Sequence, residues 1–278
     1  MKQNIVIVGL GLIGGSLAKA FRACGGFRVA GIDRDESVLR AALACGAVDR
    51  AGTEDDIRNA DILYLCLYPR ADVAFTREHL GAIRPGCLVT DTCGIKSWLC
   101  PRMAALAGER GFVFVGGHPM AGKEKSGFAA SDGGLFRGAS YILVPCGAPR
   151  RAVDRLKALA PKLGFSGTVE TTPAEHDRII AFTSQLPHAL ACAYVRSPQC
   201  PKHNGFSAGS YRDVSRVANI NETMWTELFL ENRAALAEEL DTLIRHLGEI
   251  RGAVAAGDAE TLRGLLRTGR KIKEELGE

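Results

Sequence analysis

The stretch that decides the fold is NIVIVGLGLIGGS, residues 4–16. A short, β-branched apolar run ends there in glycines, and an apolar pattern with helical spacing starts at once from Leu17. This order predicts a strand, a tight turn and a helix, which is the context that gives a G-x-G-x-x-G motif its meaning. Such a turn binds the pyrophosphate of a dinucleotide at the helix N-terminus, where N–H groups are free and the helix dipole is positive.

Each glycine of the motif has its own predicted role. Gly9 permits the tight turn, Gly11 lets the backbone approach the pyrophosphate, and Gly14 lets the helix pack closely against the strand. Asp33 closes the next apolar run, residues 27–32, about 20 residues after the glycines, where a ribose-binding carboxylate is expected. We therefore predict a dinucleotide-binding site rather than a glycine-rich turn that serves packing alone.

The composition is that of a globular protein with room for two domains. The chain has 278 residues, of which 46% are hydrophobic and 24% charged. Its net charge of +4 is spread along the chain without a long Lys/Arg run, so we expect no nucleic-acid partner. Because no apolar stretch reaches the roughly 18 residues of a membrane span, we expect no membrane association either. The nine scattered cysteines lack C-x-x-C or zinc-site spacing, which indicates free thiols, no metal site and a cytoplasmic location.

Apolar runs alternate with helical patterns through roughly the first 150 residues. This alternation predicts an α/β fold with a parallel, doubly wound sheet of Rossmann type. The expected strands are residues 4–8, 27–32, 62–67, 87–91, 112–115 and 140–145, with a weaker one at 167–170. We place the dinucleotide-binding domain at residues 1–170 and a mostly α-helical domain for substrate binding and dimerisation at residues 171–278.

The helical domain opens with a marked helix start at Thr172. Thr172 is expected to cap this helix, with Pro173 at the first helical position and Glu175 completing a capping box. Pro187 lies inside the same pattern and cannot donate to the carbonyl of Thr183, so we expect the helix to bend there.

Two further helices are predicted near the end of the chain. One long helix runs from about Asn221 to Ile250, and a last one is capped by Asp258. At 1.5 Å per residue the long helix would extend roughly 40 Å. A small domain hardly covers such an apolar stripe, so we expect a homodimer formed through the C-terminal helices; burial within one chain is the alternative.

In an open α/β sheet, ligands bind beyond the carboxyl ends of the strands. Three predicted strands end in polar or reactive residues, namely Tyr68, Asp91 and His118. His118 is the acid–base candidate because the ordinary pKa of histidine lies near neutrality. Arg216 lies in a charged cluster, residues 211–216, and its forked guanidinium suits a substrate carboxylate. The residues alone thus indicate an NAD-type oxidoreductase that acts on an anionic substrate.

Five motifs follow one another in a characteristic order. They are GLGLIGGS (9–16), HPMAGKEKSG (118–127), TSQLPH (183–188), YRDVSRVA (211–218) and Met224-Trp225 with Asn232. With them the chain resembles the prephenate dehydrogenase family, which includes arogenate and cyclohexadienyl dehydrogenases. It looks like the monofunctional form, without a regulatory domain or a chorismate mutase segment.

The resemblance implies oxidative decarboxylation of prephenate to 4-hydroxyphenylpyruvate with reduction of NAD, a step of tyrosine biosynthesis. It implies that His118 accepts the proton of the ring hydroxyl while hydride leaves the same carbon, so that activity rises with pH through the pKa of His118. Arg216 would hold a substrate carboxylate and His188 would lie beside the substrate. The other implied substrate-site residues are Glu124, Asp213, Lys123 and Trp225, the first two forming a gating ionic network with Arg216.

The implied cofactor site extends the glycine turn. Its residues are Gly9, Gly11, Leu12, Ile13, Gly14, Asp33, Arg34, Tyr68 and Gly94. Asp33 favours NAD because a 2′-phosphate would meet its charge, whereas Arg34 leaves use of NADP open. Gly94 departs from the family pattern: many relatives have a serine there that orients the catalytic histidine, and Thr92 or a water would have to substitute for it.

Several alternatives stay open at this point. Arogenate is the alternative substrate, and Lys123 is an indication in favour of the keto acid prephenate. Less favoured are another two-domain hydroxy-acid dehydrogenase and a non-catalytic NAD-binding protein. Inhibition by tyrosine is a further expectation, since Gly209 belongs to a glycine stretch expected near the pocket.

Overall fold

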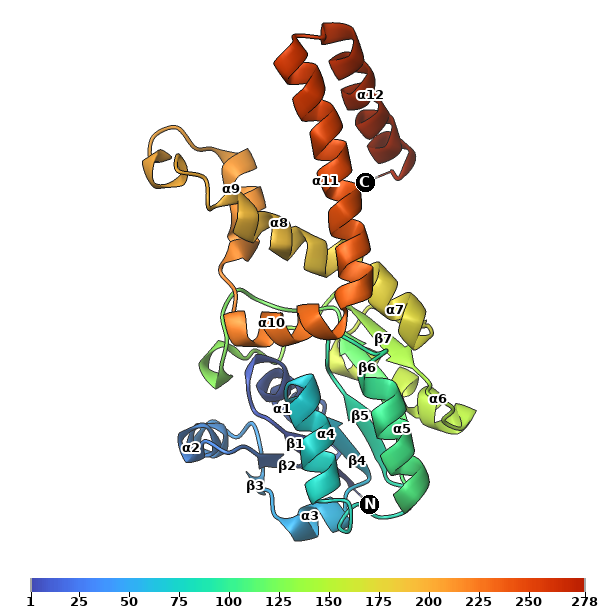
Figure 1. The fold of residues 1–278 in the computed structure, drawn as a ribbon. Helices are drawn as coiled ribbons and strands as arrows, with labels where there is room; N and C mark the ends of the chain where they lie inside the picture. The colour runs from blue at the N-terminus through green and yellow to red at the C-terminus, as the bar shows by residue number, and fades with distance from the viewer. Residues whose placement is uncertain (1, 278) are drawn as a thin grey trace. The chain divides into compact units, whose positions relative to one another are not determined.

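The computed structural model describes residues 2–277. Within it the chain divides into two compact units, the first ending at Asn232 and the second beginning at Arg233. The first unit contains the sheet and the helices around it, and the second contains two helices (Figure 1).

An eight-stranded sheet forms the centre of the first unit (Figure 1). Its strands are β1 (Gln3–Val8), β2 (Phe27–Ile32), β3 (Arg50–Ala51), β4 (Ile62–Leu65), β5 (Leu88–Asp91), β6 (Val113–Pro119), β7 (Ser140–Val144) and β8 (Gly167–Glu170). Their order across the sheet is β3-β2-β1-β4-β5-β6-β7-β8. The predicted α/β fold of Rossmann type is confirmed, and the chain reverses its winding direction between β1 and β4, where such sheets bind nucleotides.

The sheet is mixed, so the expectation of a wholly parallel one was wrong at one pair of strands. The described strands pair in parallel except β6 and β7, where Gly117 pairs with Leu143 and His118 with Ile142 in antiparallel register. The connection between these strands carries only a short 3₁₀ turn, Phe128–Ala130, and a crossover helix is what a parallel return requires. The sequence pattern also missed β3, which has only two residues at the sheet edge.

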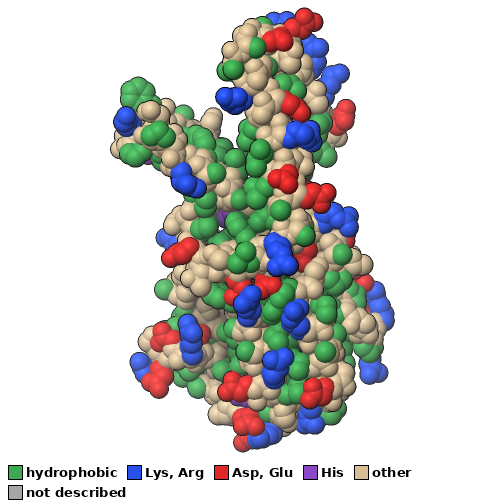
Figure 2. Space-filling model, viewed as in Figure 1, with side chains coloured by type: hydrophobic (Ala, Val, Ile, Leu, Met, Phe, Trp, Pro, Cys, Tyr) green, Lys and Arg blue, Asp and Glu red, His purple; other side chains and the backbone are tan. Residues whose placement is uncertain are grey.

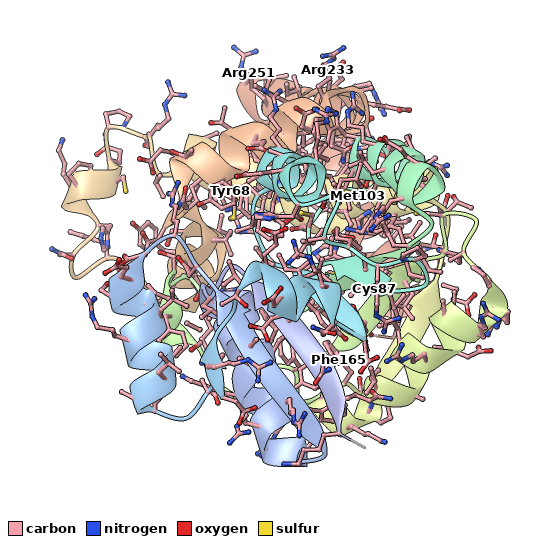
Figure 3. The ribbon with its side chains drawn as sticks, turned by 90° about the horizontal axis from the view of Figure 1, so that it is seen from below. Tyr68, Cys87, Met103, Phe165, Arg233 and Arg251 are labelled. Carbon is pink, nitrogen blue, oxygen red and sulfur yellow. The ribbon has the colours of Figure 1, made fainter. Side chains whose placement is uncertain are left out.

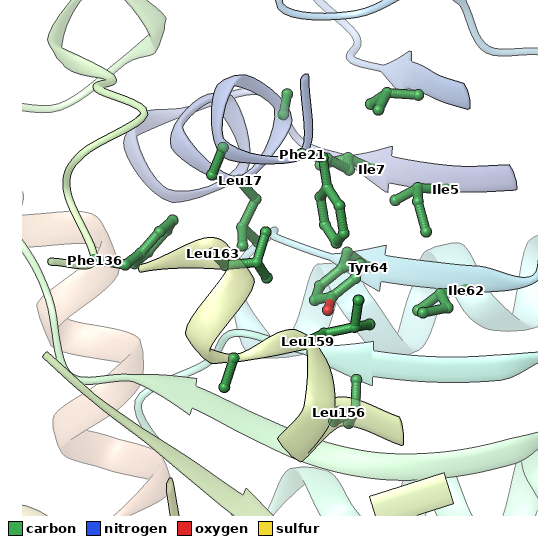
Figure 4. Close-up of a cluster of buried hydrophobic side chains, with 14 of the residues drawn as sticks. Ile5, Ile7, Leu17, Phe21, Ile62, Tyr64, Phe136, Leu156, Leu159 and Leu163 are labelled. Carbon is green, nitrogen blue, oxygen red and sulfur yellow. The ribbon is translucent and has the colours of Figure 1, made fainter. Parts of the chain in front are cut away.

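Helices cover both faces of the sheet. One face carries α1 (Leu12–Cys24), α2 (Glu36–Ala44) and α6 (Arg150–Leu159), and the other carries α3 (Glu54–Arg58), α4 (Pro69–Glu78) and α5 (Leu99–Arg110). In Figure 4, Phe21 of α1 and Leu159 of α6 lie close to Tyr64 of β4. On the other face, Met103 and Cys87, labelled in Figure 3, belong to the second core cluster. Burial on both faces explains why the strands read as continuous apolar runs.

A widened helical turn separates α7 (Pro173–Ile180) from α8 (Leu186–Tyr194). The intervening residues, Ala181–Gln185, form a π-helix that ends two residues before Pro187. A proline has no N–H to continue the α-helical pattern. The expected departure from a regular α-helix near Pro187 is confirmed, in the form of this π-helical turn. The Thr172 cap is confirmed as well, since its hydroxyl accepts the Glu175 N–H at 3.2 Å; the reciprocal bond of a capping box is not among the described contacts.

The predicted long helix at 221–250 was wrong, because the structure has two helices there. These are α10 (Glu222–Glu231), capped by Asn221, and α11 (Arg233–Ala256). Asn232 interrupts them with φ −115° and ψ 26°, and its buried amide donates to the Asp177 carbonyl and to Gln185 Oε1. These bonds to distant parts of the chain fix the break. Before α10, the chain forms α9 (Gly209–Ser215) and 3₁₀ turns at Cys200–Lys202 and Arg216–Ala218.

The second unit is a pair of helices that lie side by side (Figure 1), α11 and α12 (Ala259–Glu275). Asp258 caps α12 as predicted, accepting the Thr261 N–H at 3.0 Å. Large apolar side chains of both helices are exposed, among them Ile244, Leu247 and Leu266. Among residues 2–277, no helix combines the length and the apolar composition that crossing a membrane would need. Figure 2 shows Lys and Arg side chains interspersed with Asp and Glu over the visible face.

Candidate active site

The glycine turn joins the carboxyl end of β1 to α1. Gly9 has φ +85°, and a Cβ at this position would lie 2.6 Å from the Cys66 carbonyl oxygen. A Cβ at Gly14 would lie 1.8 Å from the carbonyl oxygen of Gly9, so turn and helix can pack this closely only without side chains. At Gly11, by contrast, no described atom lies within 4 Å of the Cβ position. The turn therefore leaves open space at the one glycine that is predicted to face the pyrophosphate.

The N-terminus of α1 is available to an anion. Gly11 is its N-cap, and within the described chain no side chain caps the first-turn N–H groups that begin with Leu12 and Ile13. Asp33 lies against the same turn, because its Oδ2 accepts the Leu10 N–H at 2.7 Å while its Oδ1 accepts the Asp35 N–H at 2.9 Å. These donors, the open space and the fixed carboxylate together fit a dinucleotide.

Two other predicted cofactor residues lie at the edges of this region. The Arg34 side chain is exposed directly after Asp33. Tyr68, labelled in Figure 3, is the N-cap residue of α4, and its hydroxyl accepts a hydrogen bond of 3.2 Å from Asn221 Nδ2. Tyr68 thus connects the end of β4 to the start of α10.

His118 lies one residue before the end of β6 and is half-buried. Its Nδ1 is 2.9 Å from Nε2 of His176. On the other side of the ring, a Cβ at Gly94 would lie 3.7 Å from both Cε1 and Nε2. The Thr92 hydroxyl donates to the Leu65 carbonyl at 3.4 Å, so the group that bonds the His118 ring is His176.

His176 and Asp177 stand in the first two turns of α7 and are both buried. His176 Nδ1 lies 2.7 Å from Asp177 Oδ1. Asp177 also accepts the backbone N–H groups of Lys96 and Ser97, each at 2.7 Å. Burial alone would raise the pKa of Asp177, but the hydrogen bonds from His176 and Ser97 outweigh it and hold that pKa below its usual value. Asp177 is therefore an ionised anchor for both the His176 ring and the loop 92–97.

Burial shapes the protonation of both imidazoles. It lowers the pKa of His118 well below its ordinary value, with smaller contributions in the same direction from His176 and Lys96. Burial also lowers the pKa of His176, although Asp177 opposes this shift. Both rings are therefore neutral at neutral pH, which is the form in which a histidine accepts a proton.

A fully buried ion pair supports the loop beside His118. Lys96 Nζ donates to Asp91 Oδ2 at 2.6 Å and to the Cys93 carbonyl at 2.7 Å. Asp91 Oδ1 accepts the N–H of Gly117, the residue before His118, at 3.0 Å. Breaking such a pair leaves an uncompensated buried charge, so it fixes the geometry around His118.

Asp72, Asp91 and Cys93 have side-chain ligand atoms within 4.8 Å of one another, the kind of grouping that metals use. Here the Lys96 ammonium already supplies a cation to Asp91, and the Cys93 thiol donates to Asp72 at 3.1 Å. Burial, followed by the charge of Asp91, raises the pKa of Asp72 to about 8. Asp72 is thus protonated at neutral pH, and the grouping is a hydrogen-bonded support of the loop.

The predicted ionic network appears as a pair. Arg216, at the start of the 3₁₀ turn after α9, forms an ion pair with Glu124 of the loop after β6. Asn219 Nδ2 donates to the Glu124 carbonyl at 3.5 Å, which adds a second link between the segments. Asp213 makes no ion pair within the part of the chain that the structure describes. Lys123 pairs with Asp132, at 3.4 Å between Nζ and Oδ2.

His188 and Trp225 stack face to face, with ring centroids 3.8 Å apart and an interplanar angle of 28°. His188 Nδ1 lies 2.8 Å from the carbonyl oxygen of Ser184, in the π-helical turn. Burial lowers the pKa of His188, so its ring is neutral, with Nδ1 as donor and Nε2 free to accept. The site residues thus form four groups: the glycine turn, His118 with Gly94, the pair Arg216–Glu124, and the pair His188–Trp225.

Comparison with known proteins identifies the family. Residues 17–166 match the model of the prephenate dehydrogenase nucleotide-binding domain, and residues 172–268 match that of the prephenate dehydrogenase dimerization domain. The chain belongs to the prephenate dehydrogenase family. As a member of this family it is an oxidoreductase with an NAD-binding domain.

Individual relatives agree over nearly the whole chain. Prephenate dehydrogenase of Bacillus subtilis (strain 168) is 33% identical over 291 residues, covering 99% of this chain and 76% of the relative. Cyclohexadienyl dehydrogenase of Zymomonas mobilis is 32% identical and covers 94% of this chain and 91% of the relative. A crystal structure of prephenate dehydrogenase from A. aeolicus, in complex with hydroxyphenyl propionate and NAD+, is 27% identical, with a TM-score of 0.88 and 99% coverage of each chain.

The residues missed by the sequence analysis are His176 and Asp177, both in direct line with His118. Their signal was present in the helical spacing, since they lie four and three residues before the buried Ile180 and share its face. Adjacent titratable residues on a buried helical face are unusual enough to indicate a functional site. Asn232 and Gln185 occur in the family motifs, but their role in joining α10 to α7 appeared only in the structure.

Proposed function

We propose that this enzyme catalyses the oxidative decarboxylation of prephenate to 4-hydroxyphenylpyruvate with reduction of NAD, and that His118 is its catalytic base. Membership of the prephenate dehydrogenase family supports the reaction. The observation that carries the role of His118 is its position near the carboxyl edge of the sheet, with one ring nitrogen bonded to His176 and the other facing Gly94.

The proposed cofactor site is built around the glycine turn and Asp33. The N–H groups of Leu12 and Ile13 would hold the pyrophosphate, and Asp33 would accept a hydrogen bond from the adenine ribose. Gly9 and Gly14 shape the turn, Arg34 and Tyr68 flank it, and Gly94 leaves room beside His118. NAD+, when bound, supplies the acceptor for a hydride. Because the ribose-facing charge is negative, we propose a preference for NAD over NADP.

In the proposed chemistry His118 takes up one proton and later returns it. Its Nε2 accepts the proton of the ring hydroxyl while hydride leaves the same carbon, so an O–H bond breaks and an N–H bond forms. The ring carboxylate then leaves as carbon dioxide, and its bonding electrons complete an aromatic phenolate. The imidazolium returns the same proton to this oxygen, so no net proton is consumed.

The proposed substrate site combines the other two groups of residues. Arg216 would hold a substrate carboxylate through its forked guanidinium. Glu124 and Asp213 would form with it an ionic network that gates the pocket. The stacked His188 and Trp225 would line the pocket, and His188 would offer its free nitrogen to a polar group of the substrate. Lys123 would lie near the end of the substrate that carries its side chain.

Arogenate is the second candidate substrate, since a relative at 32% identity is a cyclohexadienyl dehydrogenase. The deciding experiment crosses prephenate and arogenate with NAD and NADP and measures kcat/KM for each combination. We expect the highest value for prephenate with NAD. Reduction of neither cofactor with either substrate would refute the proposed function, and equal efficiency with both cofactors would refute the proposed NAD preference.

We also propose that residues 171–278 contain the dimerisation surface and that the enzyme is a homodimer. The match of residues 172–268 to a dimerization domain supports this, as do the exposed apolar residues of α11 and α12. Light scattering coupled to size-exclusion chromatography tests it, and a monomer at micromolar concentration would refute it.

Two finer properties complete the proposal. A cytoplasmic location is supported by nine cysteines that are all free thiols in the structure, as in reducing compartments. Inhibition by tyrosine is proposed because tyrosine carries the same hydroxyphenyl ring as the product. Titrating tyrosine into the prephenate assay tests the second property, and an unchanged rate at saturating tyrosine would refute it.

A further inference from the structure

Three side chains form a hydrogen-bonded line that ends at the ring proposed to take the proton. His118 Nδ1 lies 2.9 Å from His176 Nε2, and His176 Nδ1 lies 2.7 Å from Asp177 Oδ1. Asp177 cannot adjust its position freely, because it also accepts the N–H groups of Lys96 and Ser97. Its backbone carbonyl is held in turn by the buried amide of Asn232.

The donors and acceptors along this line can be assigned. Asp177 is ionised, and an ionised carboxylate only accepts hydrogen bonds, here from the Lys96 and Ser97 N–H groups and the Ser97 side chain. His176 Nδ1, which faces Oδ1, must therefore carry a hydrogen. A neutral imidazole has one N–H, so His176 Nε2 is an acceptor. His118 Nδ1 must then carry the hydrogen that is donated to His176 Nε2. The Nε2 of His118 is left with a free lone pair.

We infer that His176 and Asp177 are positioning residues that hold His118 in the tautomer whose Nε2 is free to accept the substrate's proton. The catalytic consequence rests on the proposed function, whereas the tautomer assignment follows from the hydrogen bonds and the neutral state of the two rings. Once His118 is protonated, the Asp177 carboxylate at the end of the line stabilises the positive charge through the intervening ring. No proton has to move along the line for this effect.

The surroundings of His118 make this chain depend on His176. On the Nε2 side stands Gly94, which has no side chain to orient the ring, and the Thr92 hydroxyl is bonded to the Leu65 carbonyl. The charged groups around the two rings are Asp177, Asp91 and Lys96, of which only Asp177 bonds a ring. Orientation of His118 through a side-chain hydrogen bond therefore comes from its Nδ1 side.

Nitrogen-15 NMR of histidine-labelled enzyme tests the tautomers without any turnover. We expect the His118 signals to show hydrogen on Nδ1 and a bare Nε2, with the same arrangement for His176; the His118→Asn variant assigns the first ring. A His118 ring that carries its hydrogen on Nε2 in the unmodified enzyme would overturn the inference. This measurement remains valid even when neither prephenate nor arogenate is a substrate, so failure of the proposed function and failure of the inference are distinguishable.

Kinetics of two variants test the consequence. In His176→Phe the acceptor for the Nδ1 hydrogen of His118 is lost. We expect kcat to fall about 10- to 100-fold, the range for partners that orient metal-binding histidines. Because the wrong tautomer is also neutral, raising the pH should not restore this loss, and NAD affinity should be unchanged. In His176→Gln the amide oxygen can accept the Nδ1 hydrogen, so part of kcat should return. Wild-type kcat in a folded His176→Phe variant would contradict the inference; where that variant does not fold, the NMR result decides.

Discussion

Arg216 and Glu124, 92 residues apart in the sequence, form an ion pair that joins the turn after α9 to the loop after β6. Both side chains are partly exposed, at 58% and 38%, so the pair itself adds little stability in water. In the proposed function the pair contributes through placement, because it would hold the forked guanidinium ready for a substrate carboxylate. A substrate carboxylate would share the guanidinium with Glu124 or replace it.

The first prediction concerns this guanidinium. A charge-assisted hydrogen bond contributes about 1.5–3 kcal/mol, so Arg216→Ala should raise KM for prephenate roughly 10- to 100-fold and change kcat less. Arg216→Lys should give an intermediate KM, because an ammonium lacks the two-pronged geometry. Arg212→Ala removes a nearby cation and serves as the control. Equal KM values for the wild type and Arg216→Ala would exclude the proposed carboxylate contact.

The second prediction concerns His118. Replacing the base in His118→Asn should lower kcat roughly 10²- to 10⁴-fold, while a fluorescence titration shows unchanged NAD affinity. His79, whose ring lies tilted against that of Phe75 at the end of α4, provides the control: His79→Asn also removes an imidazole. Undiminished turnover in His118→Asn would remove the catalytic role.

The third prediction is a pH dependence of stability. Unfolding returns the lowered pKa values of His118 and His176 to their ordinary value near 6.5, so below that pH the unfolded chain binds more protons than the folded one. Stability should therefore decrease as pH falls through 6.5 and change little on this account above it. Urea unfolding at pH 5.5 and 7.5 measures the difference, which should shrink in His118→Asn. A difference unaffected by that substitution would show that His118 does not contribute.

The fourth prediction separates two glycines of the turn. Gly11→Ala adds a methyl group where no described protein atom lies within 4 Å, so the melting temperature should hold while NAD affinity falls roughly tenfold or more. Gly14→Ala forces a methyl group against the Gly9 carbonyl, so the melting temperature itself should fall by several degrees. Calorimetry and NAD titration of both variants provide the test. Normal NAD binding by Gly11→Ala would place the pyrophosphate elsewhere.

The fifth prediction uses the raised pKa of Asp72, about 8. Its folded pKa exceeds the unfolded value, so stability from this group is complete below about pH 4 and is lost progressively as pH rises to 8. Asp72→Asn keeps the shape and removes this titration, and its amide can donate to the Cys93 sulfur. The variant should melt a few degrees higher than the wild type at pH 8 and show a smaller difference at pH 5. Asp241→Asn, on exposed α11, should show no such trend; a lower melting temperature for Asp72→Asn at pH 8 would contradict the prediction.

Local signals in the sequence predicted local structure well. The β1–α1 turn, the Thr172 cap and the distortion before Pro187 each depend on residues a few positions apart, and the structure confirms all three. The break at Asn232 escaped prediction because it depends on Asp177 and Gln185, which lie 55 and 47 residues away. The antiparallel β7 escaped for a similar reason, since its direction follows from a connection without a crossover helix.

The candidate site shows the same difference between local signals and contacts of distant residues. Glycine spacing and family motifs indicated His118, Arg216 and His188, because each stands in a recognisable stretch of sequence. Nothing in those stretches says which side chain touches the Nδ1 of His118. That contact joins β6 to α7 across 58 residues, so it needed the three-dimensional arrangement.

Both carboxylate oxygens of Asp33 accept backbone hydrogen bonds, one from the Leu10 N–H and one from the Asp35 N–H. Asp33 consequently stabilises the glycine turn in addition to placing a negative charge where a 2′-phosphate would lie. Under the proposed NAD preference, a redesign toward NADP by Asp33→Ser or Asp33→Ala would relax the turn while it removes the charge, so affinity for both coenzymes would fall. A successful redesign has to supply a new acceptor for the Leu10 N–H together with a cation that binds the 2′-phosphate.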